Sequence, residues 1–173
     1  MEIAIRDGSL IAAGFPTVAA GLRALEVGVV ELQVDRDLTA RSLISDDRLP
    51  LGDEAAVRRL AEEARAHGIR ICALLCAQDF NGDRAAAIDY VAVAARAAQA
   101  VGAATVRIDS IMTGQRELPL DERIRIYADG CRAALAATAE TGVALGIENH
   151  GHQGNDPAWM AGVLAAVADP RLG

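Results

Sequence analysis

The chain lacks lysine altogether: its 173 residues include 17 basic side chains, and every one of them is arginine. A Schiff base with a substrate and the attachment of pyridoxal phosphate both require a lysine amine, so neither can form within this chain. The P-loop of nucleotide-binding proteins also needs a lysine that reaches the phosphates. The absence of lysine therefore excludes all three of these sites from this chain.

Aromatic residues are few, and the chain has no excess of positive charge. Aromatic side chains make up 3% of the chain, and the formal net charge at pH 7 is −7. A nucleic-acid-binding surface needs clustered positive charge to bind the phosphate backbone. We therefore expect no nucleic-acid partner.

Long apolar runs are also absent, although 52% of the residues are hydrophobic. The stretch from Ala85 to Val101 is interrupted by Asp89 and Arg96, so no window offers the roughly 18 uncharged apolar residues that a membrane span needs. The N-terminus lacks the basic stretch, apolar run and cleavage site of a secretory signal. We expect a cytoplasmic protein without membrane contact.

Cysteine is rare, and its spacing predicts no disulfide. Cys72 and Cys76 stand four residues apart in an expected strand, which separates them by about 13 Å, too far for a disulfide. No second pair of cysteine or histidine residues lies beside them at the spacing of zinc ligands. We interpret these residues as buried thiols.

A helix that ends at glycine and leads into an apolar run recurs along the chain. The four glycines are spaced by 40, 34 and 40 residues, and they are Gly28, Gly68, Gly102 and Gly142. Glycine suits the left-handed position that ends a helix, and the spacing matches that of βα units. Asp53 and Asp83 stand where N-caps belong, which predicts helices from about Glu54 to Ala66 and from Arg84 to Val101.

Five strands alternate with helices in this pattern. We expect the strands at Glu2–Arg6, Val29–Val34, Arg70–Cys76, Thr105–Ser110 and Ala144–His150, with a helix after each. Strict alternation predicts an α/β protein with a parallel sheet joined by right-handed crossovers. We favour the first five units of a (β/α)8 TIM barrel. The alternative is a flavodoxin-like doubly wound sheet, against which the loop from Asp7 to Ile11 is no evident phosphate cradle.

The last residues predict the beginning of a sixth strand. Asp169-Pro170-Arg171-Leu172-Gly173 resembles a helix end followed by a strand. A closed barrel needs about 200 to 250 residues or more, so five units amount to about five-eighths of one. We therefore expect residues 1–173 to be a partial, truncated TIM barrel domain. Its open strand edges favour a homo-oligomer.

Polar residues follow the expected strands at the edge where parallel α/β proteins place their sites. They are Asp35 and Arg36 after the second strand, Gln78, Asp79 and Asn81 after the third, Asp109 and Ser110 after the fourth, and Glu148, Asn149, His150 and His152 after the fifth. In the fifth strand, alternation directs Glu148 and His150 to one side and Asn149 to the other. An inward carboxylate without a partner is costly, and a divalent cation or a substrate hydroxyl would offset that cost.

The run Gly146-Ile147-Glu148-Asn149-His150-Gly151, followed by Asp156-Pro157 and by the final five residues, resembles the sugar phosphate isomerase/epimerase family of xylose isomerase-like TIM barrels. The resemblance implies that Glu148 is a ligand of a catalytic divalent metal and one of two acid/base carboxylates. It also implies three further ligands, an Asp, a His and a Glu, from the sixth, seventh and eighth strands. This segment alone would therefore be inactive.

The implied reaction is isomerisation or epimerisation of a sugar, a sugar phosphate or a related polyol, by proton abstraction next to a carbonyl through an enediolate. Oxygen-rich ligation favours Mn²⁺ or Mg²⁺, with Zn²⁺ or Co²⁺ as alternatives. We expect substrate contacts from four residues, namely His150, His152, Arg107 and Asp109.

Each of these assignments has a structural alternative. Glu148 could form an ion pair at the strand end, His150 could be a buried histidine bonded to the backbone, and Arg107 and Asp109 could form an internal salt bridge. Two other functions compete with the isomerase. An endonuclease IV-like metal phosphodiesterase would share the fold, although the acidic net charge argues against it, and a non-catalytic α/β binding domain would need no metal.

Overall fold

The computed structural model describes residues 3–173 and contains one five-stranded sheet and one two-stranded sheet. The larger sheet is parallel throughout, and its strands lie in the order in which they occur along the chain. They are β1 (Ile5–Arg6), β2 (Val29–Gln33), β5 (Arg70–Cys76), β6 (Thr105–Asp109) and β7 (Ala144–Glu148). A flavodoxin-like sheet has the order 2-1-3-4-5, so that alternative is wrong, whereas sequential order is that of a barrel.

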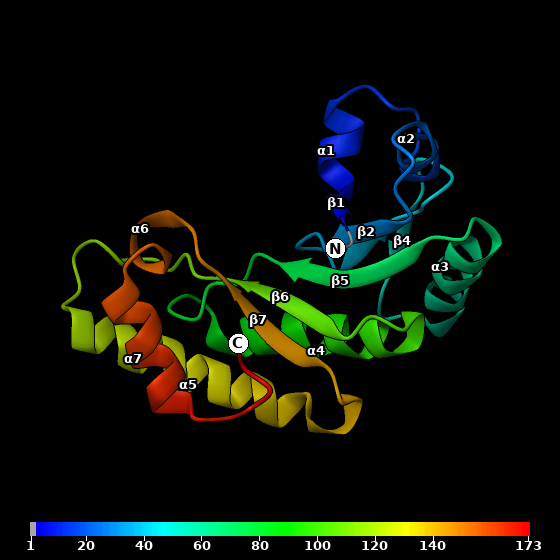
Figure 1. Cartoon of the computed structure of the whole chain (residues 1–173). Helices are drawn as coiled ribbons and strands as arrows, with labels where there is room; N and C mark the ends of the chain where they lie inside the picture. Colours follow the sequence, from blue (N-terminus) through cyan, green and yellow to red (C-terminus); the bar gives the residue numbers. More distant parts are fainter. Residues whose placement is uncertain (1–2) are drawn as a thin grey trace.

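The helices that follow the strands cover one face of this sheet. Figure 1 shows α3, α4, α5 and α7 along that face, and neighbouring helices pack on one another. The helices are α1 (Asp7–Ala12), α2 (Val18–Ala24), α3 (Glu54–Ala66), α4 (Arg84–Val101), α5 (Leu120–Ala137), α6 (Gly151–Gly154) and α7 (Pro157–Val167), with a 3-10 turn η1 at Ala139–Thr141. This is the arrangement of the outer helical ring of a barrel.

Helix boundaries follow local signals closely. The side chains of Asp53 and Asp83 accept hydrogen bonds from the backbone N–H groups of Ala55 and Ala86, which confirms the predicted starts of α3 and α4. Among the four expected glycines, Gly28 is the exception. The left-handed residue at the end of α2 is Glu26, with φ 55°, because that helix ends at Ala24 and the chain turns before it reaches Gly28.

A helix follows each of the five strands, as expected, but in the second unit a hairpin that we did not expect comes first. There β2 is followed by an antiparallel hairpin of β3 (Thr39–Arg41) and β4 (Arg48–Pro50) before α3 begins. The buried carboxylate of Glu63 on α3 accepts hydrogen bonds of 2.8 Å from the hydroxyl of Ser42 and from the N–H of Leu43, and so anchors the hairpin loop. Because this anchor lies about twenty residues away, local sequence pattern does not reveal the hairpin.

Most expected strands are slightly longer than the observed ones. Glu2 lies outside the described residues, and of the remainder only Ile5–Arg6 forms the first strand. The second, fourth and fifth strands end one or two residues early. Beyond the last strand, Leu172 forms a parallel bridge with Leu145, and Leu145 donates a 2.8 Å hydrogen bond to the carbonyl of Arg171. The predicted beginning of a sixth strand is thereby confirmed.

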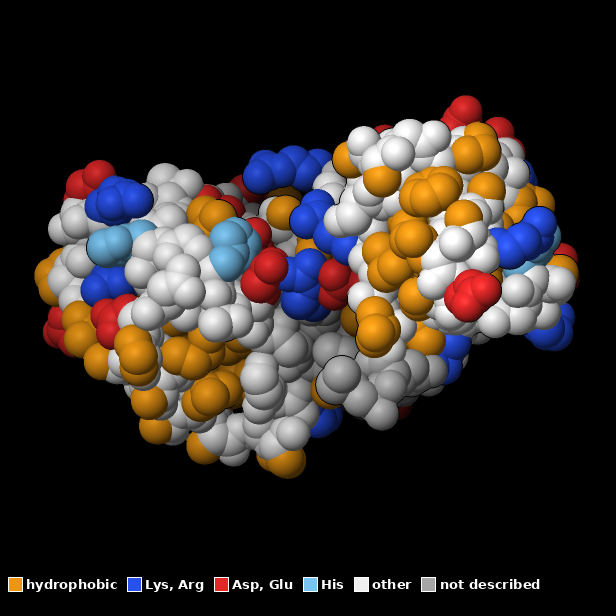
Figure 2. All heavy atoms as spheres, turned by 45° about the horizontal axis from the view of Figure 1, so that its top comes forward, with side chains coloured by type: hydrophobic (Ala, Val, Ile, Leu, Met, Phe, Trp, Pro, Cys, Tyr) orange, Lys and Arg blue, Asp and Glu red, His pale blue; other side chains and the backbone are white. Residues whose placement is uncertain are grey.

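The two faces of the sheet differ in polarity. Residues that point to the helices are apolar and buried, among them Val30, Leu32, Val106, Ile108 and Leu145. Alternate residues on β2, β6 and β7 point to the opposite, inner face and are half-buried, among them Glu31, Gln33, Arg107, Asp109 and Glu148. Figure 2 shows acidic, basic and histidine side chains gathered near the middle of the molecule. The charged groups therefore lie where a barrel has its interior.

Two further observations complete the fold. The cysteines Cys72, Cys76 and Cys131 are free; Cys76 and Cys131 are buried, whereas Cys72, which we expected to be buried, is only partly so. Of the helices in residues 3–173, none is both long and apolar enough to cross a membrane.

Packing of α5 on the loop after β5 gives a test of this architecture. Gly130 on α5 lies directly against the ring of Phe80, which is fully buried, and an added Cβ would overlap that ring. We expect Gly130→Ala to lower the free energy of unfolding by about 1 to 3 kcal/mol, because overpacking outweighs the gain in helix propensity. Urea denaturation followed by circular dichroism measures the change.

Gly8→Ala is the matched control, because the nearest atom to an added Cβ on α1 is Arg6 Nε at 3.9 Å. That variant should unfold at the same urea concentration as the parent chain or at a higher one. Equal stability of the Gly130→Ala variant and the parent chain would contradict the packing described here.

Candidate functional site

The site begins with the pairing of β6 and β7 at the carboxyl edge of the sheet. Asp109 pairs with Glu148, and two residues earlier Arg107 pairs with Gly146. Residues in register on parallel strands point to the same face, so the two carboxylates emerge side by side on the inner face.

Arg107 connects three strands of the sheet. Its Nε and Nη2 atoms donate to the two carboxylate oxygens of Glu31 on β2 at 2.6 and 2.7 Å, and its Nη1 atom contacts Glu148 Oε2 on β7. Strand β5 lies between β2 and β6, and its small Ala73 is in register with Glu31, so the guanidinium can pass over it. Parallel double hydrogen bonds of this kind are the strongest arginine–carboxylate arrangement.

The electrostatics of Arg107 follow from this geometry. Its side chain is 20% exposed, and burial by itself lowers the pKa of a guanidinium. The hydrogen bonds and charges of Glu31 and Glu148 outweigh that effect and raise the pKa of Arg107 above its ordinary value. Arg107 is therefore a permanent cation, and its charge is shared between two carboxylates.

His150 completes a compact group with the two strand-end carboxylates. Its Nδ1 atom lies 3.3 Å from Glu148 Oε2 and 3.5 Å from Asp109 Oδ1. This nitrogen is buried and has no hydrogen-bond partner of acceptable geometry. One ligand atom from each of Asp109, Glu148 and His150 lies within 4.8 Å of the others. We call these three residues the strand-end triad.

The backbone of Asp109 is held by two buried side chains. Gln78 donates to the Asp109 carbonyl at 2.6 Å and accepts from the Asp109 N–H at 2.9 Å, and the Tyr127 hydroxyl donates to the same carbonyl at 2.6 Å. The Asp109 carboxylate in turn accepts a hydrogen bond of 2.7 Å from the N–H of Ile111. These bonds fix the end of β6 and aim its carboxylate.

The other polar residues after the strands have different surroundings. Asp79 accepts hydrogen bonds from Thr113, and Asn81 donates to the carbonyl of the same residue, so both tie two loops together. Asp35 forms an ion pair with Arg48 of the hairpin. His152 is exposed on α6 and is not part of the strand-end triad.

The structure thus brings together four of the five predicted site residues, Glu148, His150, Arg107 and Asp109, and leaves His152 apart. Arg107 does lie in an internal salt bridge, but its partners are Glu31 and Glu148, whereas the alternative that we considered paired it with Asp109. Sequence reasoning missed Glu31, Gln78 as an anchor and Tyr127. Glu31 had a detectable signal, because Glu31 and Gln33 alternate with apolar residues in β2 just as Arg107 and Asp109 do in β6.

The strand-end triad has the donors that a divalent cation requires. Two carboxylates and an imidazole nitrogen suit Mn²⁺, Mg²⁺, Zn²⁺ or Co²⁺. The separations of 3.3 and 3.5 Å from His150 Nδ1 to Glu148 and Asp109 are compatible with ligands of one ion at bonds of about 2.0 to 2.2 Å. The unpartnered His150 Nδ1 offers a free nitrogen to such an ion. Glu31 offsets the charge of Arg107, so Asp109 and Glu148 leave a net negative site. The residues therefore fit a divalent metal.

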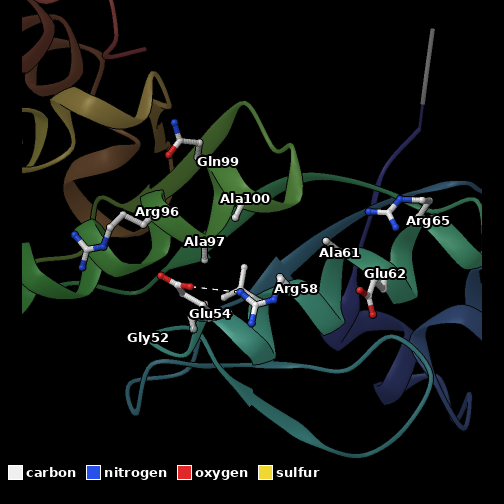
Figure 3. Close-up of a pocket in the computed structure, with 12 residues that line it drawn as sticks. Gly52, Glu54, Arg58, Ala61, Glu62, Arg65, Arg96, Ala97, Gln99 and Ala100 are labelled. Carbon is white, nitrogen blue, oxygen red and sulfur yellow. Dashed lines mark hydrogen bonds and ion pairs between the residues drawn. The ribbon is translucent and has the colours of Figure 1, made fainter.

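A groove on the surface lies away from the strand ends. It measures about 660 Å³ and runs between α3 and α4, lined among others by Glu54, Arg58, Arg65 and Arg96. Figure 3 shows these side chains on α3 and α4, and Glu54 pairs with Arg58 at 3.4 Å. Because the strand ends carry the clustered acid, base and imidazole groups, we place the functional site there and not in this groove.

Solved structures resemble this fold, although no curated protein sequence matches the chain. The 3-keto-D-glucoside 4-epimerase YcjR from E. coli has a TM-score of 0.72 and 14% identity, with 99% of this chain and 66% of that chain covered. The IolI protein with a binding zinc atom has a TM-score of 0.71 and 16% identity, with 100% and 61% covered.

A sugar phosphate isomerase/epimerase from Parabacteroides distasonis ATCC 8503 has a TM-score of 0.65 and 13% identity, with 86% of this chain and 51% of that chain covered. The present chain therefore spans between about half and two-thirds of the length of these structures. Such low identities establish the shared fold alone.

The family model gives the assignment. The model described as xylose isomerase-like TIM barrel matches residues 17–173, which is nearly the whole chain. Together with the sequential parallel sheet and its single helical face, this match shows that the chain belongs to the xylose isomerase-like TIM barrel family.

Proposed function

We propose that this chain belongs to a divalent-metal-dependent isomerase or epimerase that acts on a sugar, a sugar phosphate or a related polyol. The observation that carries the proposal is the strand-end triad, in which Asp109, Glu148 and His150 present two carboxylates and a free imidazole nitrogen at the carboxyl edge of the sheet. In this fold catalytic residues come from that edge. The activity is proposed for the whole protein, of which the described residues supply one side of the site.

The similar structures support the substrate class and the metal. YcjR is an epimerase of a 3-keto-D-glucoside, and the IolI structure holds a zinc atom. Two carboxylates and one imidazole favour Mn²⁺ or Mg²⁺, and the imidazole also suits Zn²⁺ or Co²⁺. A small-molecule partner follows from this proposal, while a cytoplasmic location and a homo-oligomer stay predictions.

The chemistry is assigned to side chains at the strand ends. When bound, a divalent ion would polarise the carbonyl and a neighbouring hydroxyl of an open-chain sugar. Glu148, as a ligand and as one of two acid/base groups, would take the proton from the carbon next to the carbonyl. A second carboxylic acid would return a proton to the adjacent carbon in an isomerase, or to the opposite face of the same carbon in an epimerase.

The neighbouring side chains would bind and orient. Asp109 and His150 border Glu148 and would contact the ion or the substrate hydroxyls. Arg107 directs the Glu148 carboxylate from the sheet side. His152 lies at the exposed rim on α6, where a substrate contact would require the substrate to extend outward.

The metal assignment predicts the effect of one substitution on binding. Glu148→Gln removes the anionic ligand but preserves the size of the side chain, so we expect the affinity of chain 1–173 for Mn²⁺ to fall at least about tenfold. Electron paramagnetic resonance of free Mn²⁺ in a titration measures the affinity directly.

Glu54→Gln is the matched control. Because Glu54 lies on the exposed surface of α3, this substitution should leave the affinity for Mn²⁺ unchanged. If the Glu148→Gln variant binds Mn²⁺ as tightly as the parent chain, the metal role of Glu148 is wrong.

The proton-abstraction step predicts isotope exchange. The protein as its host produces it should introduce deuterium from D₂O next to the carbonyl of a sugar in a panel of ketoses, aldoses and their phosphates, as followed by proton NMR. Glu148→Gln should slow this exchange by about 100-fold or more, since general acid–base catalysis contributes about that much. Removal of metal by EDTA should abolish the exchange, and added Mn²⁺ should restore it.

Glu54→Gln again serves as the control and should exchange at the parent rate. Exchange that proceeds equally in the Glu148→Gln variant, or that never occurs with any sugar of the panel in the Mn²⁺-loaded protein, would contradict the proposed reaction.

A further inference from the structure

Glu31 is connected to the strand-end triad through Arg107, although it lies on a distant strand. It lies on β2, separated from β7 by both β5 and β6, and so it belongs to the opposite side of the described sheet. Its side chain is 18% exposed, and its two oxygens accept both parallel hydrogen bonds from Arg107. A carboxylate on a distant strand therefore determines where the guanidinium lies.

Arg107 presents a problem for any cation at the triad. Its Nη1 atom contacts Glu148 Oε2, the same oxygen that lies 3.3 Å from His150 Nδ1. A positive charge at that place competes with a metal ion for the carboxylate and repels the ion. Yet the same contact orients Glu148, and outer-shell partners of this kind commonly orient metal ligands.

Glu31 resolves this conflict in two ways. The bidentate pair fixes the plane of the guanidinium, so that only one of its nitrogens faces Glu148. The negative charge of Glu31 also offsets part of the field of Arg107 at the triad. Arg107 is suited to this task because its planar group can engage two carboxylates at once, which a lysine could not do in the same geometry.

We propose that Glu31 is a positioning residue for the metal site, acting through Arg107 so that the guanidinium orients Glu148 without displacing the cation. The inference rests on the proposed function in one respect, namely that the triad binds a divalent ion. The new element is that Glu31 on β2, two strands away from Asp109 on β6, controls the affinity of the triad for the ion.

The test is a double-mutant cycle on chain 1–173, with Mn²⁺ alone as the probe and electron paramagnetic resonance of free Mn²⁺ as the readout. Glu31→Gln should weaken Mn²⁺ binding by about tenfold, the lower end of the loss expected for an outer-shell partner. Arg107→Met removes both the repulsion of the ion and the contact that orients Glu148, so it should bind Mn²⁺ more tightly than the Glu31→Gln variant, in which the repulsion stays. Adding Glu31→Gln to Arg107→Met should change the affinity by less than about twofold, because Glu31 then has no guanidinium to hold.

Arg107→Lys supplies a second, independent arm. It preserves the positive charge but cannot make the parallel bonds to Glu31, so we expect Mn²⁺ binding about tenfold weaker than in the parent chain. Asp47→Asn is the matched control, since it breaks an ion pair with Arg59 on the hairpin side and should leave the affinity unchanged. Thermal unfolding of each variant verifies that the fold is retained.

The outcomes separate the two proposals. The positioning role would be overturned, while the metal site stands, if Glu31→Gln or Arg107→Lys left the affinity for Mn²⁺ unchanged. It would also be overturned if Glu31→Gln lowered the affinity equally in the parent chain and in the Arg107→Met variant. Absence of Mn²⁺ binding by the parent chain, or binding insensitive to Glu148→Gln, would instead overturn the proposed function.

Discussion

Parallel pairing of the strands is the constraint on which the rest of this structure depends. Each strand can pair with its predecessor only if the chain returns across the sheet, and right-handed crossovers place every return on the same face. Helices α3, α4, α5 and α7 therefore lie along one face, and that face collects the apolar side chains. The inner face is left to residues such as Glu31, Arg107 and Glu148, and the carboxyl ends of all five strands lie at one edge.

Charges on such a face are costly unless they are compensated. A half-buried carboxylate or guanidinium loses part of its hydration, so each needs a partner of opposite charge or a bound ion. Arg107 satisfies Glu31 completely and Glu148 in part. What remains is the excess negative charge of Asp109 and Glu148 beside an unpartnered imidazole nitrogen, and this imbalance is the physical basis of the proposed metal site.

The position of that excess charge depends on anchors outside the site. Gln78 forms two hydrogen bonds with the backbone of Asp109, much as a neighbouring strand would, beyond the point where β5 and β6 stop pairing. Tyr127 adds a third bond from α5, and its ring packs at 4.9 Å between centroids against Trp159 of α7. Tyr127 therefore takes part both in the apolar packing of α5 on α7 and in holding the backbone of Asp109, which carries one of the carboxylates of the site.

Sequence by itself determined the periodic features of this protein. The helix caps Asp53 and Asp83, the strand at residues 70–76, the parallel β-then-α order and the inward pair of Glu148 and His150 all follow from local pattern, because capping and alternation depend on neighbours within a few residues. Only the tertiary structure decided which charges meet. Glu63 anchors the hairpin at Leu43, 20 positions away. Arg107 contacts Glu31, 76 positions away, and Glu148, 41 positions away. Such contacts depend on strand register and crossover geometry, which no local pattern encodes.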